Sequence, residues 1–250
     1  MIKDKLVVKI FDSRPAMGLA AAAAVSARIR EVLERAPYVN VIFASAPSQV
    51  EFLASLLEMK VDWSRLNAFH MDEYVGLDKD APQGFGNFLK DRLFSKVSCR
   101  EEHYLDGNAA HPEQECVRYA QLLEKYPTDI VCLGIGENTH LAFNDPHVAL
   151  FDDPRIVKVV DLDEACRRQQ VNDGCFASIG EVPSYALTIT IPALFKSTYA
   201  YAVVPGPAKA NAIYHTLYNE IEPQYPSTIL RTHPNAVLFI DNNSAFRLPG

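Results

Sequence analysis

Short apolar runs alternate with longer stretches of helical composition along the whole chain. Runs rich in Val, Ile and Leu are typical of strands that are buried on both faces, and the stretches between them predict helices. The predicted strands are 6–11, 39–44, 66–71, 130–133, 155–160, 185–191, 200–204 and 236–241. The predicted helices are 14–35, 48–57, 84–93, 113–125, 164–171 and 206–218.

This alternation predicts a doubly wound, mostly parallel sheet with helices on both faces, a three-layer α/β/α, Rossmann-like fold. Ser48 and Glu51 match a capping box that would open the second helix. The sequence contains no internal repeat, low-complexity segment or linker. We therefore expect residues 1–250 to form a single domain.

Composition and charge narrow the class of protein. With 250 residues, of which 48% are hydrophobic, the chain has enough apolar side chains for a large core. Its net charge of −7 argues against nucleic acid or an anionic membrane as the main partner. The 5 cysteines form no Cys-x-x-Cys pair, and neither a signal peptide nor a membrane-spanning run is recognisable. These features predict a cytoplasmic protein with reduced thiols.

Polar side chains gather where two predicted strands end. Asp72 and Glu73 follow the strand 66–71 directly. After the strand 130–133, Gly134 and Gly136 allow sharp turns, and the next residues supply Asn138, His140 and Asp145. The carboxyl ends of parallel strands meet at one edge of a sheet, where open α/β sheets bind their ligands. Helix capping or a polar turn with a satisfied histidine is the structural alternative.

Two of these segments together resemble a known family. Phe69-His-Met-Asp-Glu-Tyr-Val-Gly-Leu77 and Leu133-Gly-Ile-Gly-Glu-Asn-Thr-His-Leu-Ala-Phe-Asn-Asp-Pro146 are similar to the signatures of the glucosamine-6-phosphate deaminase (isomerase) family, which is related to the 6-phosphogluconolactonases. The similarity continues at 182–188, 206–210 and 226–233. It implies a sugar-phosphate isomerase or deaminase that acts on an amino sugar phosphate, and the Asn144-Asp145-Pro146 ending favours this branch over the lactonases.

The resemblance also implies roles for four residues. Asp72 would move a proton between C1 and C2 of the open-chain sugar, and His140 would help to open the ring. Asp145 matches the glutamate that orients the histidine. Where the family usually has an acid, this chain has Asn138. Asn138 and Asp145 are the expected partners that fix the imidazole tautomer, and the neutral amide predicts inefficient ordinary deamination.

The expected phosphate end also departs from the family pattern. The family has a Gly-rich loop where this chain has Phe43-Ala-Ser-Ala-Pro-Ser48. Pro47 has no N–H to donate, which weakens a backbone phosphate cradle. Lys209 matches the phosphate-side lysine, and Arg167 is chosen as the second cation. The expected substrate-binding residues are Ser45, Ala46, Glu73, Gly136, Arg167 and Lys209.

Two other functions stay open at this stage. One is a lactonase-type hydrolase on a sugar acid phosphate, and the other is a non-catalytic sugar-phosphate-binding protein that has lost the proton relay. The sequence predicts no metal site, because the histidines have no zinc-like spacing, and neither function requires a cofactor. The expected binding partner is a small-molecule sugar phosphate. Association of identical chains into a homo-oligomer is the other interaction considered.

Overall fold

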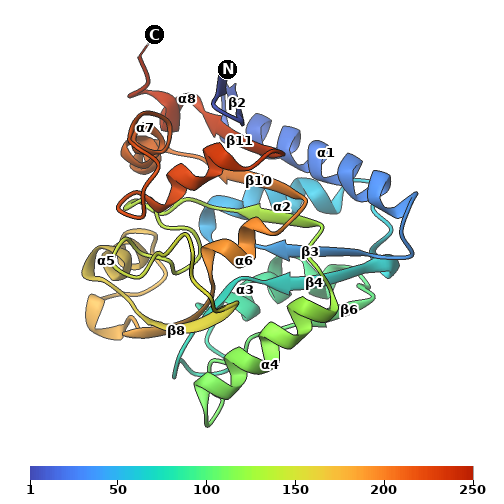
Figure 1. Cartoon of the computed structure of the whole chain (residues 1–250), viewed down its shortest axis with the longest axis vertical. Helices are drawn as coiled ribbons and strands as arrows, with labels where there is room; N and C mark the ends of the chain where they lie inside the picture. The colour runs from blue at the N-terminus through green and yellow to red at the C-terminus, as the bar shows by residue number, and fades with distance from the viewer. Residues whose placement is uncertain (250) are drawn as a thin grey trace.

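The computed structural model describes residues 1–249 and places an 8-stranded sheet at the centre of the protein (Figure 1). All neighbouring strands pair in parallel except the edge pair β1–β2, which is antiparallel. The strand order is β1 (Ile2–Lys3), β2 (Leu6–Phe11), β11 (Ala236–Asp241), β10 (Tyr199–Val204), β7 (Ile130–Leu133), β3 (Val39–Phe43), β4 (Leu66–His70) and β6 (Glu101–His103). The predicted mostly parallel α/β fold is therefore confirmed.

Helices cover both faces of this sheet because its strands are apolar on both sides. In β3, Ile42 packs into the core on one face, while Val41 and Phe43 pack into the core on the other. The first face is covered by α4 (Pro112–Lys125), α6 (Ile191–Phe195) and α7 (Ala210–Tyr218). The second face is covered by α1 (Arg14–Leu33), α2 (Val50–Leu57) and α3 (Phe85–Arg92).

A second, 3-stranded antiparallel sheet lies beside the first. It consists of β5 (Asp72–Tyr74), β9 (Tyr185–Ile189) and β8 (Val157–Asp161). The sequence pattern indicated β8 and β9 but neither their separate sheet nor β5, which follows β4 after the single residue Met71. Figure 1 shows β8 together with α5 (Glu164–Asn172), away from α1.

The remaining elements are short. They are α8 (Asn242–Ala245) and the 3₁₀ helices η1 (Pro47–Gln49), η2 (Trp63–Arg65), η3 (Phe94–Lys96), η4 (Ile179–Glu181), η5 (Pro207–Lys209) and η6 (Pro226–Thr232). Within residues 1–249, no helix is both long and apolar enough to cross a membrane. That residues 1–250 form a single domain stays a prediction.

The capping box expected at the start of the second helix is absent. Ser48 lies inside η1, where its hydroxyl accepts a hydrogen bond from the Gln49 side chain at 3.0 Å. The Glu51 carboxylate instead pairs with the Arg14 guanidinium on α1, with an Nη2–Oε2 distance of 2.8 Å. The prediction was wrong because a distant arginine competes for the glutamate, and α2 begins at Val50 without a side-chain cap.

Candidate active site

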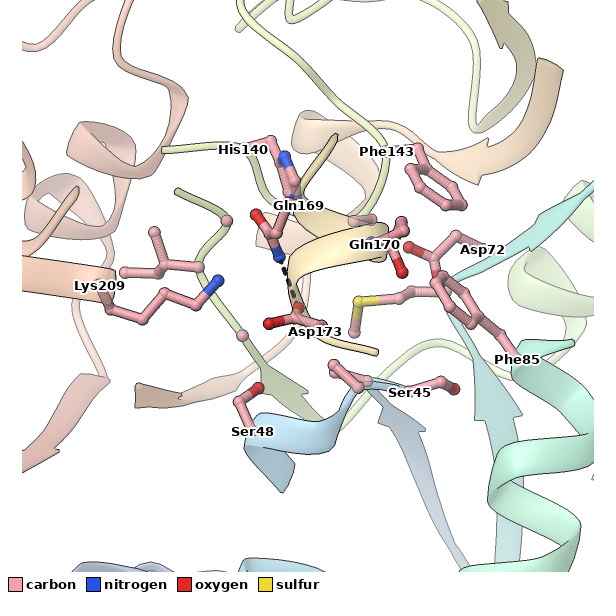
Figure 2. Close-up of a pocket in the computed structure, with 17 residues that line it drawn as sticks. Ser45, Ser48, Asp72, Phe85, His140, Phe143, Gln169, Gln170, Asp173 and Lys209 are labelled. Atoms are coloured by element: carbon pink, nitrogen blue, oxygen red, sulfur yellow. Dashed lines mark hydrogen bonds between the residues drawn. The ribbon is translucent and has the colours of Figure 1, made fainter. Parts of the chain in front are cut away.

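A cavity opens at the carboxyl ends of β3, β4 and β7, where the sequence predicted a ligand site (Figure 2). Residues from the loops after these strands line it, and α5, α3 and η5 close its other sides. The lining residues are Ala44, Ser45, Ala46, Ser48, Met71, Asp72, Phe85, Gly134, Ile135, Gly136, His140, Ala142, Phe143, Gln169, Gln170, Asp173 and Lys209. The fold thus brings six of the expected site residues to one cavity.

Asp72 is the most unusual ionisable group in this cavity. It is 5% exposed, and its Oδ1 atom is buried without a hydrogen-bond partner in the described structure. Burial, and secondarily the nearby charge of Glu73, raises the pKa of Asp72 well above its usual value. A desolvated carboxylate that reaches a cavity and has a raised pKa is suited to general acid–base chemistry.

Glu73 points away from the cavity, because successive side chains of a strand lie on opposite faces. Its carboxylate accepts hydrogen bonds from the backbone N–H groups of Phe85, at 3.0 Å, and Gly86, at 2.8 Å. These N–H groups belong to the first turn of α3, so Glu73 caps this helix. The expected contact between Glu73 and a substrate is therefore not supported by the structure.

His140 folds back over Gly136 in the loop after β7. A Cβ atom on Gly136 would lie 2.2 Å from the imidazole Nε2, so only glycine leaves space for the ring. The backbone bonds Gly136 N–H to His140 C=O at 2.9 Å and Thr139 N–H to Gly136 C=O at 3.0 Å close the turn. Gly136, which was expected to contact the substrate, lines the cavity and also makes room for His140.

Asp145 lies behind the imidazole and is completely buried. Its Oδ1 atom is 3.0 Å from Nδ1 of His140, within the distance of an ion pair. Burial by itself would raise the pKa of Asp145, but His140 and the Asn138 amide hold it below the usual value. A carboxylate that stays ionised here favours the imidazole tautomer with hydrogen on Nδ1 and leaves Nε2 for the ligand.

Asn138 lies behind this pair and does not contact the imidazole ring. Its Nδ2 donates to Asp145 Oδ1 at 3.0 Å and to Asp163 Oδ2 at 3.2 Å. Its Oδ1 accepts from the backbone N–H of His140 at 3.2 Å. The direct tautomer contact that we expected from Asn138 is therefore replaced by a bridge between two carboxylates, which an ionised aspartate at this position could not make because it has no donor.

The bridge reaches the helix that forms one wall of the cavity. Asp163 is the N-cap of α5, where its side chain accepts from the Cys166 N–H at 2.6 Å. Possible ligand atoms of His140, Asp145 and Cys166 lie within 4.8 Å of one another. Burial, followed by the charges of Asp145 and Asp163, raises the pKa of the Cys166 thiol well above its usual value. The thiol is thus held in its protonated form, which is a poor metal ligand.

At the other end of the cavity, Lys209, Ser45 and Ser48 provide polar side-chain groups that can bind a substrate. Lys209 is 7% exposed, and burial lowers its pKa against the opposing effect of the Asp173 and Glu137 carboxylates. The Ser45 hydroxyl is buried without a partner in the described structure. Ala46 lines the cavity as the residue before η1, and it has no side-chain group to offer.

The chain matches the model of the family described as glucosamine-6-phosphate isomerases/6-phosphogluconolactonase over residues 12–239. It belongs to this family. A protein named glucosamine-6-phosphate deaminase from Exiguobacterium sp. is 35% identical over 187 residues, which cover 75% of this chain and 72% of that relative. Another of the same name from Bacillus cereus is 31% identical over 216 residues, which cover 86% and 80%.

Solved structures agree with this membership. A monomeric glucosamine-6-phosphate deaminase superposes with a TM-score of 0.88 at 28% identity, covering 96% of this chain and 99% of that one. A 6-phosphogluconolactonase from Thermotoga maritima gives a TM-score of 0.77 at 22% identity, covering 95% and 100%, and shares the fold alone. The family resemblance found in the sequence is confirmed.

The arginine chosen for the phosphate does not line the cavity of this family member. Arg167 Nη2 donates to the carbonyl oxygens of Ile179, at 2.7 Å, and Val182, at 2.9 Å. It ties α5 to the following loop, so the expected phosphate contact is not supported. The inward face of α5 instead presents Gln169, Gln170 and Asp173, which sequence reasoning missed.

The side chains of α5 are polar on several sides, so the sequence alone does not tell which of them face the cavity. The two adjacent amides Gln169 and Gln170, just before the helix ends at Asp173-Gly174, were the sequence feature that could have drawn attention to this helix end.

We predict that Gly136→Ala displaces the His140 ring, because the added Cβ would overlap it. Overpacking of this kind lowers the free energy of unfolding by roughly 1–3 kcal/mol. Urea unfolding and the NMR signals of the His140 ring measure the two effects. Gly134→Ala is the matched control, since its Cβ would come no closer than 3.4 Å to another atom. Equal behaviour of the two variants would contradict the packing role.

We predict that Asn138→Asp destabilises the protein, because a third carboxylate would face Asp145 and Asp163. Unpaired like charges in a buried site cost about 1–3 kcal/mol at pH 8 and less at lower pH, where the introduced carboxyl group takes up a proton more readily. The double variant Asn138→Asp/Asp163→Asn should recover most of the loss, as asparagine still caps a helix. If single and double variants unfold at the same urea concentration, the two side chains do not interact.

Proposed function

We propose that the protein is an aldose–ketose isomerase and deaminase that acts on an amino sugar phosphate such as glucosamine 6-phosphate. The observation that carries this proposal is the buried Asp72 carboxylate, which has an oxygen without a partner among the described residues and lines the same cavity as His140, the partner of Asp145. Relatives at 35% and 31% identity that bear the name glucosamine-6-phosphate deaminase support it.

The reaction would begin with ring opening. His140 takes the proton of the anomeric hydroxyl and delivers it to the ring oxygen, while Asp145 stabilises the charged imidazolium between the two transfers. This step needs a fixed orientation of the imidazole ring, which the close packing of His140 against Gly136 provides.

Proton transfer along the carbon chain would follow. Asp72 removes the proton from C2. The C–H electron pair forms the C1=C2 double bond, and the C1 carbonyl pair moves onto O1, which takes a proton from solvent to give an enolamine. The Asp72 carboxyl group then returns its proton to C1 while the nitrogen lone pair forms a C2 iminium. Water adds to this iminium, the adduct expels ammonia, and the proton released from the added water converts ammonia to ammonium, so one water is consumed for each ammonium released. The raised pKa of Asp72 helps it to act as base and then as acid.

We also propose a cellular location and a binding partner for the protein. The five cysteines carry no disulfide within the described residues, which supports a reducing, cytoplasmic setting. The expected binding partner is the sugar phosphate itself, held by Lys209 and Ser45.

The proposal is tested by incubating the protein with glucosamine 6-phosphate and measuring ammonium and ketose phosphate. Equal amounts of both products are expected. Acid release from 6-phosphogluconolactone without ammonium from the amino sugar would favour a lactonase instead. Calorimetric binding of glucosamine 6-phosphate without any product would favour a non-catalytic binding protein. Either result overturns the proposed reaction.

We predict that Asp72→Asn abolishes turnover, because an amide cannot accept the C2 proton. The same change should stabilise the fold at pH 8, since it removes the cost of ionising a buried carboxyl group whose pKa is raised. The gain should be smaller at pH 4.5 than at pH 8, because protonation removes the charge of the Asp72 carboxylate.

The measurements are ammonium release and urea unfolding at both pH values. Asp152→Asn, at an exposed position, is the control that should change neither quantity. Retained turnover in Asp72→Asn would remove Asp72 from the reaction.

A further inference from the structure

The end of the cavity around Lys209 contains a carboxylate as well as an ammonium group. Of the described residues that line the cavity, Lys209 has the only permanent positive charge, whereas Asp72 and Asp173 are both acidic. Figure 2 shows Asp173 in the opening between Lys209 and Asp72. Of the surrounding charges, that of the Asp173 carboxylate acts most strongly on the Lys209 ammonium. An anionic group bound by Lys209 would therefore meet a negative charge next to it.

Asp173 is held in this position by a hydrogen-bonded side chain. The Gln169 amide Nε2 donates to Asp173 Oδ2 at 3.3 Å, and its Oε1 accepts from the backbone N–H of Glu137 at 2.8 Å. Gln169 is thus fixed at both ends, between the loop after β7 and the end of α5. The carboxylate is a built part of the cavity wall.

Three backbone positions around this end have no free N–H for a phosphate. The two short helices that contribute residues to the cavity lining, η1 and η5, begin with Pro47 and Pro207, which have no N–H. The N–H of Gly206, the residue before η5, already donates to Asp241 Oδ1 at 3.0 Å. A phosphate dianion needs several converging donors or cations, and the only cationic side chain among the described lining residues is Lys209, with the hydroxyls of Ser45 and Ser48 beside it.

The same groups are well suited to a neutral hydroxyl. A hydroxyl donates one hydrogen bond and accepts two, so it can donate to the Asp173 carboxylate while it accepts from the Lys209 ammonium. Ser45 and Gln170 add further polar atoms for the remaining sugar hydroxyls. No charge of the ligand has to approach Asp173 in this arrangement.

We propose that the cavity also takes unphosphorylated 2-amino sugars, with Asp173 and Lys209 together binding the terminal hydroxyl in place of a phosphate. The chemistry at C1 and C2 is that of the proposed function, on which this inference rests. Asp173 is then the residue that determines how strongly the protein discriminates against the phosphate.

The test compares kcat/KM for glucosamine and glucosamine 6-phosphate by ammonium release at low ionic strength, because salt screens an exposed carboxylate. In the natural protein we expect the phosphorylated sugar to be preferred less than tenfold. Asp173→Asn should raise that preference at least threefold, since the repulsion is removed and a hydroxyl acceptor is weakened. Asp152→Asn, which removes an exposed carboxylate outside the cavity lining, should leave it unchanged.

A preference of tenfold or more, or one that Asp173→Asn leaves unchanged, overturns the inference while the proposed function stands. If neither sugar releases ammonium, the proposed function fails. The inference is then tested by the affinities of an unphosphorylated and a phosphorylated probe. The probes are then 2-amino-2-deoxyglucitol and its 6-phosphate, measured by calorimetry. Similar affinities that diverge in Asp173→Asn support the inference. A preference of tenfold or more for the phosphate, or no binding of either probe, overturns it.

Discussion

The candidate site depends on the stabilisation of one completely buried carboxylate. Asp145 has no exposed surface, so its charge must be balanced by groups that the surrounding loop supplies. His140, the Asn138 amide and the backbone N–H of Asp163, at 3.4 Å, surround it. This requirement explains why the loop after β7 folds so tightly: the imidazole reaches Asp145 only by lying directly over Gly136.

Asp72 shows the opposite solution to the same physical problem. Its carboxylate is nearly as buried, but one oxygen is left without a partner in the described structure. Burial by itself raises the pKa of both acids. Hydrogen-bond donors and the histidine reverse this shift at Asp145, which stays ionised, whereas Asp72 has no such partners and is pushed toward its neutral form. A buried carboxylate oxygen without a partner costs stability, and the proposed reaction, in which Asp72 exchanges a proton with the substrate, gives this cost a function.

The Asn138 bridge links the two halves of the cavity. On one side it contacts Asp145, behind His140, and on the other side it contacts Asp163, which caps α5. Since Gln169 lies on α5 and Asp173 caps its end, the Asn138 amide connects this wall of the cavity to the loop that carries the histidine. An ionised acid in place of Asn138 could not donate to Asp163, so the two positions are best considered together.

The sequence by itself determined the parallel sheet and the edge at which Asp72, His140 and Lys209 converge. Apolar runs buried on both faces are a local pattern, and the ends of parallel strands necessarily share one edge. Tertiary structure decided the rest. Pairing of β5 with β9 joins segments more than a hundred residues apart, and it turns Asp72 inward and Glu73 toward α3. Packing also turns Asp173 into the cavity and Arg167 away from it. Side-chain direction depends on such distant partners, which no local sequence pattern contains.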